Sequence, residues 1–497
     1  LEATQPLDSL VADPEGDAFF LRVLGTDHGA ARLSGDGRSV IFTPETGYAG
    51  NAGFTLAADD GFNASSPVFV NWTISDAPLV NLDFVSRQPR FVGGERETVQ
   101  VIGDFADQAD VLLPASYLTF ESTNPAALSI SADGRISALA DGGGILTVSS
   151  HRSPDIEAAT SFCVGFPAEL QQQFLYIAGL DVYPQAVTLV TGGARQMLAG
   201  LQAEYTLGAA ASGTQYYITN PGVASVTPDG LVTAGSSEGS TYLTVINGVA
   251  EAVVPIKVES APAPGAVTVG SEGGVAQAAD GSIITIAPGA LEGDTTVNIV
   301  NLDAVADLPD GYTAPEGFDF AAGIRIDITD EDLAVPMQLA VKTSLAEGTQ
   351  VWFFRADQWL DKDGNPVNVW VQEDSGIVDP DGYARTASPP YGGATSGGVY
   401  FIGIGYEIGG VRGRVSLPIL HGLETASMVG IRALNLFGTA IGVPLHAGIF
   451  YMALPSGPRD FEIVSVREDG TLVAQTNSVE INAGRVAHFE TTFDNIP

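Results

Sequence analysis

Short runs of alternating apolar and polar residues, separated by Gly, Pro, Asn and Asp, recur along the whole chain. In "ALSISADGRISAL" (127–139), apolar and polar side chains alternate on both sides of Asp133-Gly134. A period of two puts alternate side chains on opposite faces of a strand, and Asp-Gly is typical of a tight hairpin turn. The pattern therefore predicts short antiparallel strands and an all-β fold.

One stretch occurs twice. "STNPAALSISADGRISAL" (122–139) is followed by "ITNPGVASVTPDGLVTAG" (218–235), so that Asn124-Pro125 and Asp133-Gly134 recur 96 residues later. Proline fixes φ and the Asn side chain can close a turn, so each copy predicts a turn, a strand, a hairpin turn and a second strand. The repeating unit spans about 90 residues, the size of a small β-sandwich.

The repeated pattern resembles the bacterial immunoglobulin-like group-2 family over residues 79–258. Its hallmark is S-N-P-x-V-A-x-V-x-x-D-G-x-V-T-A, followed by G-x-A-x-I-T-V. The second copy matches well, whereas the first has Ala127-Leu128 in place of Val-Ala and an irregular Gly run. The resemblance implies a spacer or adhesive module without catalysis.

Residues 1–77 resemble bacterial cadherin-like repeats, which carry an acidic cluster, a G-Y-x-G motif and a final D-G. Asn51-Ala52 departs from that pattern. The matching residues are Asp13, Glu15, Asp17, Thr43-Pro44, Gly47-Tyr48, Gly50, Phe54 and Asp60-Gly61.

A calcium site is one hypothesis for this segment. Asp13, Glu15 and Asp17 lie two residues apart on one extended stretch, and Asp59 or Asp60 would arrive from another strand. Converging carboxylates suit a hard cation, while the alternative is a solvated acidic turn. Members of the cadherin-like family usually carry another strand before the acidic cluster, and only about a dozen residues precede Asp13 here, so the resemblance implies that the sandwich lacks an edge strand. A neighbour's strand could fill such an edge, unless processing has truncated the module.

The C-terminal half continues the strand pattern after a Pro/Ala linker (260–270). Residues 272–299 resemble the start of ZU5-like β domains through Gly273-Gly274, Asp280-Gly281 and Pro288-Gly289-Ala290-Leu291. The stretch 361–365 has the residues of a calcium loop but lacks the later bidentate Glu, which favours a hairpin tip. Residues 407–497 predict a final sandwich, with 423–436 as an alternative helix and the apolar stretch 433–454 as core or interface.

Taken together, these patterns predict an all-β tandem array of about five Ig-like and cadherin-like β-sandwich domains. The expected domains are 1–77 (cadherin-like), 78–170 and 171–259 (bacterial Ig-like), 265–406 (ZU5-like) and 407–497 (C-terminal sandwich).

The net charge of the chain limits the classes of molecule that it is expected to bind. The chain has 59 acidic and 21 basic residues, a formal net charge of −38. Such a surface repels nucleic acid and anionic membranes and suits high salt or bridging divalent cations, although solubility alone would also explain it. The single cysteine, Cys163, allows no intrachain disulfide and is expected to be a small buried residue. The longest apolar stretch, 433–443, is too short to span a bilayer. Since the chain starts "LEATQPLDSL", we expect either a removed signal peptide or a piece of something longer.

The sequence offers no convincing active site. The Gly-x-Ser-x-Gly stretch 235–239 falls in a turn of the repeat, so a plain loop is favoured over a nucleophile elbow. Trp359 and Trp370 are candidate glycan-binding residues, although Trp352 nearby shares strand parity with Phe354 and is typical of a core. The histidines have no metal-ligand spacing; they are His28, His151, His421, His446 and His488.

We therefore predict a secreted or cell-surface structural protein, not an enzyme: a fibre subunit or an adhesin stalk. It would self-associate, or bind other surface proteins, by strand addition and cation-bridged acidic faces, with Ca²⁺ as the cofactor. The alternatives are a non-catalytic accessory region of a larger secreted enzyme and a glycan-binding protein.

Overall fold

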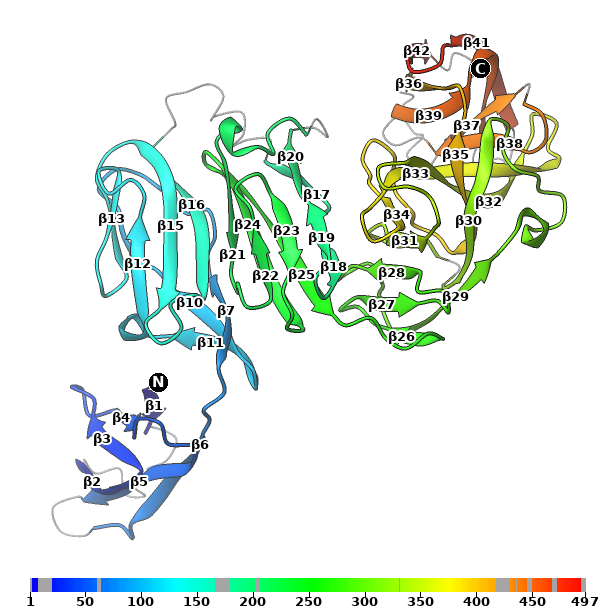
Figure 1. Ribbon diagram of the computed structural model, residues 1–497. Helices are drawn as coiled ribbons and strands as arrows, with labels where there is room; N and C mark the ends of the chain where they lie inside the picture. Colours follow the sequence, from blue (N-terminus) through cyan, green and yellow to red (C-terminus); the bar gives the residue numbers. More distant parts are fainter. Residues whose placement is uncertain are drawn as a thin grey trace. The chain divides into compact units, whose positions relative to one another are not determined.

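A computed structural model gives the fold (Figure 1). It describes residues 2–7, 20–59, 64–165, 179–201, 205–329, 331–416, 429–434, 436–444, 449–466 and 472–492. Regular structure in these residues is β-strand apart from three short 3₁₀ turns, η1 (Ala115–Tyr117), η2 (Ala210–Ser212) and η3 (Val305–Asp307). The predicted all-β fold class is confirmed.

The strands form two compact units. Unit 1 comprises 1–181, 200–221 and 241–252, and unit 2 comprises 182–199, 222–240 and 253–497. The boundary falls inside the second of the two repeats, so the domain limits drawn from the sequence stay predictions.

The N-terminal module of unit 1 has two three-stranded sheets, β1-β4-β3 and β2-β5-β6. Phe42 and Phe54 are fully buried between them and Trp72 packs on both rings. The segment that the sequence predicted to lack a first strand contains β1, which pairs antiparallel with β4. The strands are β1 (Ala3–Pro6), β2 (Phe20–Asp27), β3 (Gly29–Leu33), β4 (Ser39–Pro44), β5 (Gly50–Asp59) and β6 (Val68–Ile74).

The first repeat of unit 1 contains the sheets β11-β10-β7, β12-β15-β16-β8 and β13-β14-β9 around one apolar core. Cys163 is buried and free in this repeat, as the sequence predicted, and burial raises the pKa of its thiol. The strands are β7 (Leu79–Phe84), β8 (Arg90–Phe91), β9 (Arg96–Thr98), β10 (Val101–Phe105), β11 (Gln108–Leu113), β12 (Leu118–Ser122), β13 (Leu128–Ile130), β14 (Arg135–Ala138), β15 (Gly142–Ser150) and β16 (Glu157–Val164).

The two predicted Asp-Gly hairpins have the same geometry. β13 pairs antiparallel with β14, and β22 (Ala224–Val226) with β23 (Leu231–Ala234). Gly134 and Gly230 both occupy the left-handed region, with φ of 76° and 82°. Each glycine N–H donates to the carbonyl three residues earlier, at 2.9 Å. Glycine is needed here because other residues adopt this conformation at a cost.

The second repeat contributes strands to both units. In unit 1, β21 pairs antiparallel with β24; in unit 2, β18 pairs parallel with β25 and β19 lies beside β23. The loop 235–239, where a nucleophile elbow was considered, has no helix after it. The remaining strands are β17 (Asp181–Tyr183), β18 (Val187–Val190), β19 (Ala194–Gln196), β20 (Leu198–Gly200), β21 (Thr214–Ile218), β24 (Gly239–Asn247) and β25 (Ala250–Glu259).

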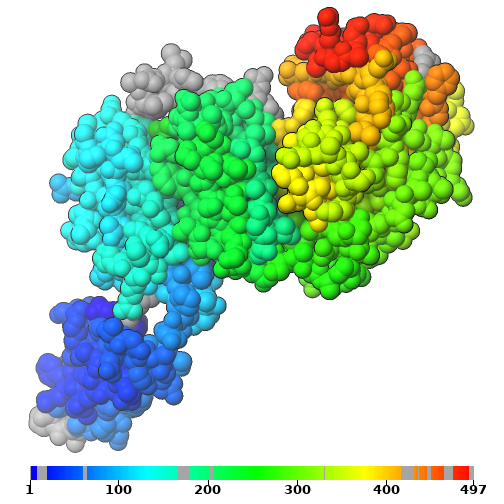
Figure 2. All heavy atoms as spheres, viewed as in Figure 1, coloured from blue at the N-terminus to red at the C-terminus, as the bar shows by residue number. Residues whose placement is uncertain are grey.

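Most of unit 2 is one large sheet that continues from the ZU5-like segment into the C-terminal segment. Its main path runs β26-β29-β30-β35-β32-β33-β34-β31-β28-β27, and β38 joins it by pairing parallel with β33. Figure 2 shows the yellow-green and orange-red residues packed into one body. The strands up to β35 are β26 (Val267–Val269), β27 (Gly274–Gln277), β28 (Ile283–Ile286), β29 (Thr295–Leu302), β30 (Phe318–Asp327), β31 (Gln338–Lys342), β32 (Gln350–Leu360), β33 (Pro366–Val378), β34 (Tyr383–Thr386) and β35 (Gly398–Gly405).

The C-terminal strands bury the apolar stretch 433–454, whose described members include Ile441, Phe450 and Leu454, all 2% exposed or less. These residues are therefore core, whereas Phe437 in the same stretch is 86% exposed. Residues 429–434 are strand where a helix was the alternative, and 423–428 lie outside the described residues. The strands are β36 (Ile408–Ser416), β37 (Val429–Leu434), β38 (Ala440–Pro444), β39 (Ile449–Pro455), β40 (Gly457–Val466), β41 (Leu472–Ile481) and β42 (Val486–Thr492).

We expect Gly134→Ala to lower the free energy of unfolding of the first repeat by about 1–2 kcal/mol, because alanine must adopt a left-handed conformation there. Gly93→Ala is the matched control, since an added Cβ meets nothing within 4 Å. Denaturant unfolding of both variants measures the difference; equal losses would contradict it.

Candidate functional site

The structure tests only part of the predicted calcium cluster. Asp13, Glu15, Asp17 and Asp60 lie outside the described residues. Asp59, at the end of β5, forms an ion pair with Arg22 at 2.8 Å. Among the residues that are described, no group of three or more His, Cys, Asp or Glu side chains is placed to hold a metal ion. The calcium site stays a prediction.

The two candidate glycan-binding tryptophans lie at the junction between β32, β33 and the C-terminal strands. Trp370 is fully buried and its indole N–H donates to the Thr313 carbonyl at 2.7 Å, so its ring belongs to the core. Trp359 is partly exposed, but one side of its ring packs against Gly430 and Gly442. A Cβ added at either glycine would lie within 2.7 Å of the ring.

The stretch 361–365 is the tip of the β32–β33 hairpin, as predicted. The Asp361 carboxylate accepts the N–H groups of Asp363 and Asn365, at 2.9 and 2.8 Å. These bonds hold the turn and lower the pKa of Asp361, the Asn365 N–H having the largest effect.

A polar group that the sequence analysis missed lies in the middle of β33. Gln372, Glu373 and Asp374 are consecutive, and each is 5% exposed or less. The residues before them in the strand, 369–371, are buried too, so both faces of β33 are covered. A run of successive polar residues in the middle of a long strand is the signal, since buried polar groups require partners.

A β-bulge orients Glu373. The pairing of β32 with β33 shifts between Phe353 and Phe354, which lie opposite Asp374 and Gln372, so that Glu373 is the extra residue. Its carbonyl accepts the Gly393 N–H at 3.0 Å, and its carboxylate accepts Nε of Arg355 at 2.7 Å. Burial raises the pKa of Glu373 to about 7, against the effect of the Arg355 guanidinium.

The neighbours of Glu373 bind different segments. The Gln372 side-chain oxygen accepts the Ala453 N–H of β39 at 2.8 Å. Asp374 accepts the Ser388 hydroxyl and, at 2.7 Å, the Ser375 N–H. Burial raises the pKa of Asp374 to about 6 despite these donors.

Arg195 of β19 brings the second repeat to the same place. Its two Nη atoms donate to the carbonyls of Thr386 and Ser388, at 2.9 and 3.2 Å. Its charge also lowers the pKa of Asp374, against the larger effect of burial. Arg195, Asp374 and the loop that contains Pro336 all line a cavity of about 230 Å³.

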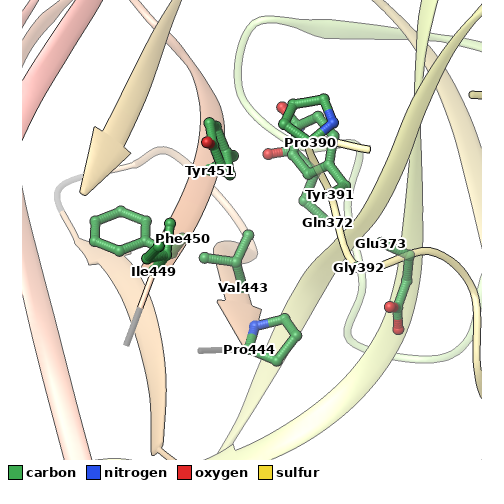
Figure 3. Close-up of a pocket in the computed structure, with 10 residues that line it drawn as sticks. All are labelled: Gln372, Glu373, Pro390, Tyr391, Gly392, Val443, Pro444, Ile449, Phe450 and Tyr451. Atoms are coloured by element: carbon green, nitrogen blue, oxygen red, sulfur yellow. The ribbon is translucent and has the colours of Figure 1, made fainter. Parts of the chain in front are cut away.

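A second, smaller cavity of about 70 Å³ lies on the Gln372 side of β33. Figure 3 shows its lining residues in two groups, those near β33 and those of the C-terminal strands, with Val443 between them. It is well below the ~300–1,000 Å³ of typical ligand pockets. The lining residues are Gln372, Glu373, Pro390, Tyr391, Gly392, Val443, Pro444, Ile449, Phe450 and Tyr451.

This arrangement is suited to holding segments together. Each polar side chain of the triple receives a donor from another part of unit 2, and none is presented to solvent. Its partners belong to other segments, 14 to 81 residues away, which is why the pattern of the strand alone does not identify them.

Comparison with known proteins gives one family match. The model described as a bacterial Ig domain matches residues 2–73, the segment that resembles a cadherin-like repeat. Both families are β-sandwiches. A search of curated proteins finds no match. In the described residues, no helix is long and apolar enough to cross a membrane.

Solved structures give low similarity. The chain is 18% identical to domains 4 and 5 of the S-layer protein SbsC, covering 37% of this chain and 100% of that chain, with a TM-score of 0.14. SbsC domains 1–6 are 15% identical, with 69% of this chain and 62% of that chain covered and a TM-score of 0.17. The extracellular cadherin domains 3–6 of protocadherin gamma B2 are 16% identical, with 50% of this chain and 70% of that chain covered and a TM-score of 0.16. These TM-scores are too low to carry an argument about architecture or role.

We expect Asp374→Asn to reduce the pH dependence of the stability of unit 2. The folded pKa of Asp374, about 6, lies above its ordinary value of 3.8. Its contribution to stability is therefore greatest below pH ~4 and falls, by at most about 3 kcal/mol, as the pH rises through 6.

Thermal unfolding between pH 4 and 7 measures this effect. Asp363→Asn is the control, because it removes the same charge from the exposed hairpin tip. An unchanged pH profile in Asp374→Asn would contradict the expectation.

Trp359→Ala should destabilise unit 2 by about 3 kcal/mol, because it leaves a void above Gly430 and Gly442. Leu360→Ala, the next residue and 45% exposed, should cost much less. Calorimetry of both variants decides the point. Equal melting temperatures in wild type and Trp359→Ala would show that the ring does not support the junction.

Proposed function

We propose that the chain is a non-catalytic structural protein of the bacterial cell surface, secreted to its site and serving as a stalk or fibre subunit. The observation that carries the proposal is the way in which successive segments are joined. In unit 2 the joints are buried hydrogen bonds to β33, Trp359 packed on two glycines, and direct pairing of β33 with β38.

Such joints resist separation. Parting β39 from β33 would leave the Gln372 oxygen and the Ala453 N–H without partners, and an unsatisfied buried group costs about 1–3 kcal/mol. Moving the Arg195 side chain away would free two carbonyls and take a positive charge from the neighbourhood of Asp374. A stalk that transmits tension requires joints of this kind, because its segments must not separate under force.

The net negative charge opposes association between copies of the chain. With a net charge of −38, like-charged faces repel unless cations lie between them. We propose that divalent cations, Ca²⁺ in particular, bridge acidic faces and that strand addition supplies the directional contact. The acidic cluster that contains Asp13, Glu15 and Asp17 is the proposed calcium site, and Asp59 would have to exchange Arg22 for the ion.

Electron microscopy of the purified chain tests the proposal. Linear polymers should form with calcium and should disperse when a chelator removes it. Magnesium at equal ionic strength separates a specific calcium effect from charge screening. Dispersed monomers at high protein concentration with calcium present would overturn the fibre proposal.

A further inference from the structure

The contact between the two repeats in unit 1 is built around one buried carboxylate. Glu251, in the second residue of β25, has a side chain that is only 3% exposed. It accepts Nη1 of Arg87 at 3.2 Å, the Thr160 hydroxyl at 3.0 Å and the Ser161 N–H at 2.6 Å. All three donors belong to the first repeat, so the carboxylate of one repeat receives these hydrogen bonds from the other repeat.

Contacts within the first repeat fix the position of the Arg87 side chain. Its Nε forms an ion pair with Asp83 at 2.7 Å, and its Nη1 also donates to the Ala159 carbonyl at 3.0 Å. The guanidinium is thus fixed by its own repeat and its charge is directed at the second one. Removing one partner of such a pair leaves the other charge buried, which is strongly destabilising.

Backbone and apolar contacts surround the charge pair. β16 and β21 lie side by side (Figure 1), with the Glu157 N–H donating to the Thr219 carbonyl at 3.1 Å. The Ser161 hydroxyl donates to the Val249 carbonyl at 3.0 Å. Beside these bonds, an apolar cluster joins both repeats. It comprises Ile145, Ala159 and Ile246, all buried, with Tyr217 packed against them.

Glycine at one position allows this close approach. A Cβ added to Gly143 would lie 2.6 Å from Cγ1 of Val249. In the alignment of "ILTVSS" (145–150) with "YLTVIN" (242–247), Gly143 is matched by Ser240, which is exposed. The Gly run that departs from the family pattern in the first copy therefore makes room for the second copy.

The turn asparagines also differ between the copies. In the first repeat, Nδ2 of Asn124 donates to the Gly143 carbonyl of its own repeat, at 3.0 Å. In the second repeat, Nδ2 of Asn220 donates to the Val80 carbonyl of the first, also at 3.0 Å. The Nδ2 atoms of the two matching asparagines thus bond differently: that of Asn124 bonds within its own repeat, and that of Asn220 bonds to the other repeat.

From these contacts we infer that the first repeat and the segments 205–221 and 241–252 of the second form one cooperative unit, locked by Glu251 and seated on Gly143. The sequence predicts two sandwiches that each close their own core. The lock makes opening of one repeat at this face open the other, so tension cannot separate them before they unfold.

Hydrogen exchange with mass spectrometry on the full chain tests the lock. In wild type, peptides from 142–164 and 241–252 should share one opening free energy. Glu251→Ala and Gly143→Val should each raise their opening equilibrium, on the order of a hundredfold for Glu251→Ala. Peptides from 366–378 of unit 2, outside this cooperative unit, should change much less. Ser240→Val is the matched control for Gly143→Val and should leave both junction peptides as in wild type.

Two further measurements keep the lock falsifiable if either variant folds poorly. Gln88→Ala removes the bond from Nε2 to the Glu251 carbonyl at 3.1 Å, together with the Oε1 acceptor of Arg90 at 3.3 Å, and should raise exchange in both junction peptides by a smaller factor. Arg87→Ala combined with Glu251→Ala should have less effect than the product of the single variants. Independent opening of the two peptides in wild type, or junction exchange that none of these variants alters, would overturn the lock. Polymer formation is measured in a separate experiment, so the result of the exchange measurement does not decide the proposed function, and failure of one proposal can be told from failure of the other.

Discussion

Polar atoms that are buried must find partners inside the protein, and in unit 2 this constraint falls on β33. Its residues 369–374 are covered on both faces, so Gln372, Glu373 and Asp374 are shielded from bulk solvent, and only the Nε2 atom of Gln372 among their described polar side-chain atoms is buried without a protein partner. The donors come from β39, from β32 and from the loop after β34. Because these donors lie far apart in the chain, satisfying one strand fixes the positions of several segments at once.

Unit 1 meets the same constraint with a single residue. Glu251 supplies a buried charge whose donors all lie in the neighbouring repeat. Here the copies differ at the points of contact, with Gly143 where the other has Ser240 and with asparagines that bond in different directions. The departures from the repeat pattern are therefore the features that join the repeats.

Local chemistry explains how much could be predicted from the sequence. The Asp-Gly hairpins, the all-β class and the hairpin tip at 361–365 depend on neighbouring residues, and the structure has them. The sequence pattern does not identify the partners of Glu251, which lie 90 to 164 residues away, or the Ser388 partner of Asp374, which lies 14 residues away across a turn. Trp370 was considered as a ligand contact although its partner, the Thr313 carbonyl, makes it a core residue. Periodicity identifies which side chains face inward, but not what they meet there.

The distribution of arginine changes the meaning of the net charge. Four arginines with side chains 19% exposed or less pair with carboxylates: Arg87 with Glu251, Arg355 with Glu373, Arg432 with Glu462 and Arg459 with Glu316. Arginine suits these places because it stays charged and donates in several directions. Each such pair withdraws one of only 21 basic residues from the surface. It also withdraws one of 59 acidic residues, so the ratio of acidic to basic groups left outside rises above that of the whole chain. Arginine therefore neutralises these four carboxylates inside the protein, while the higher ratio of acidic to basic groups outside increases the repulsion between like-charged faces.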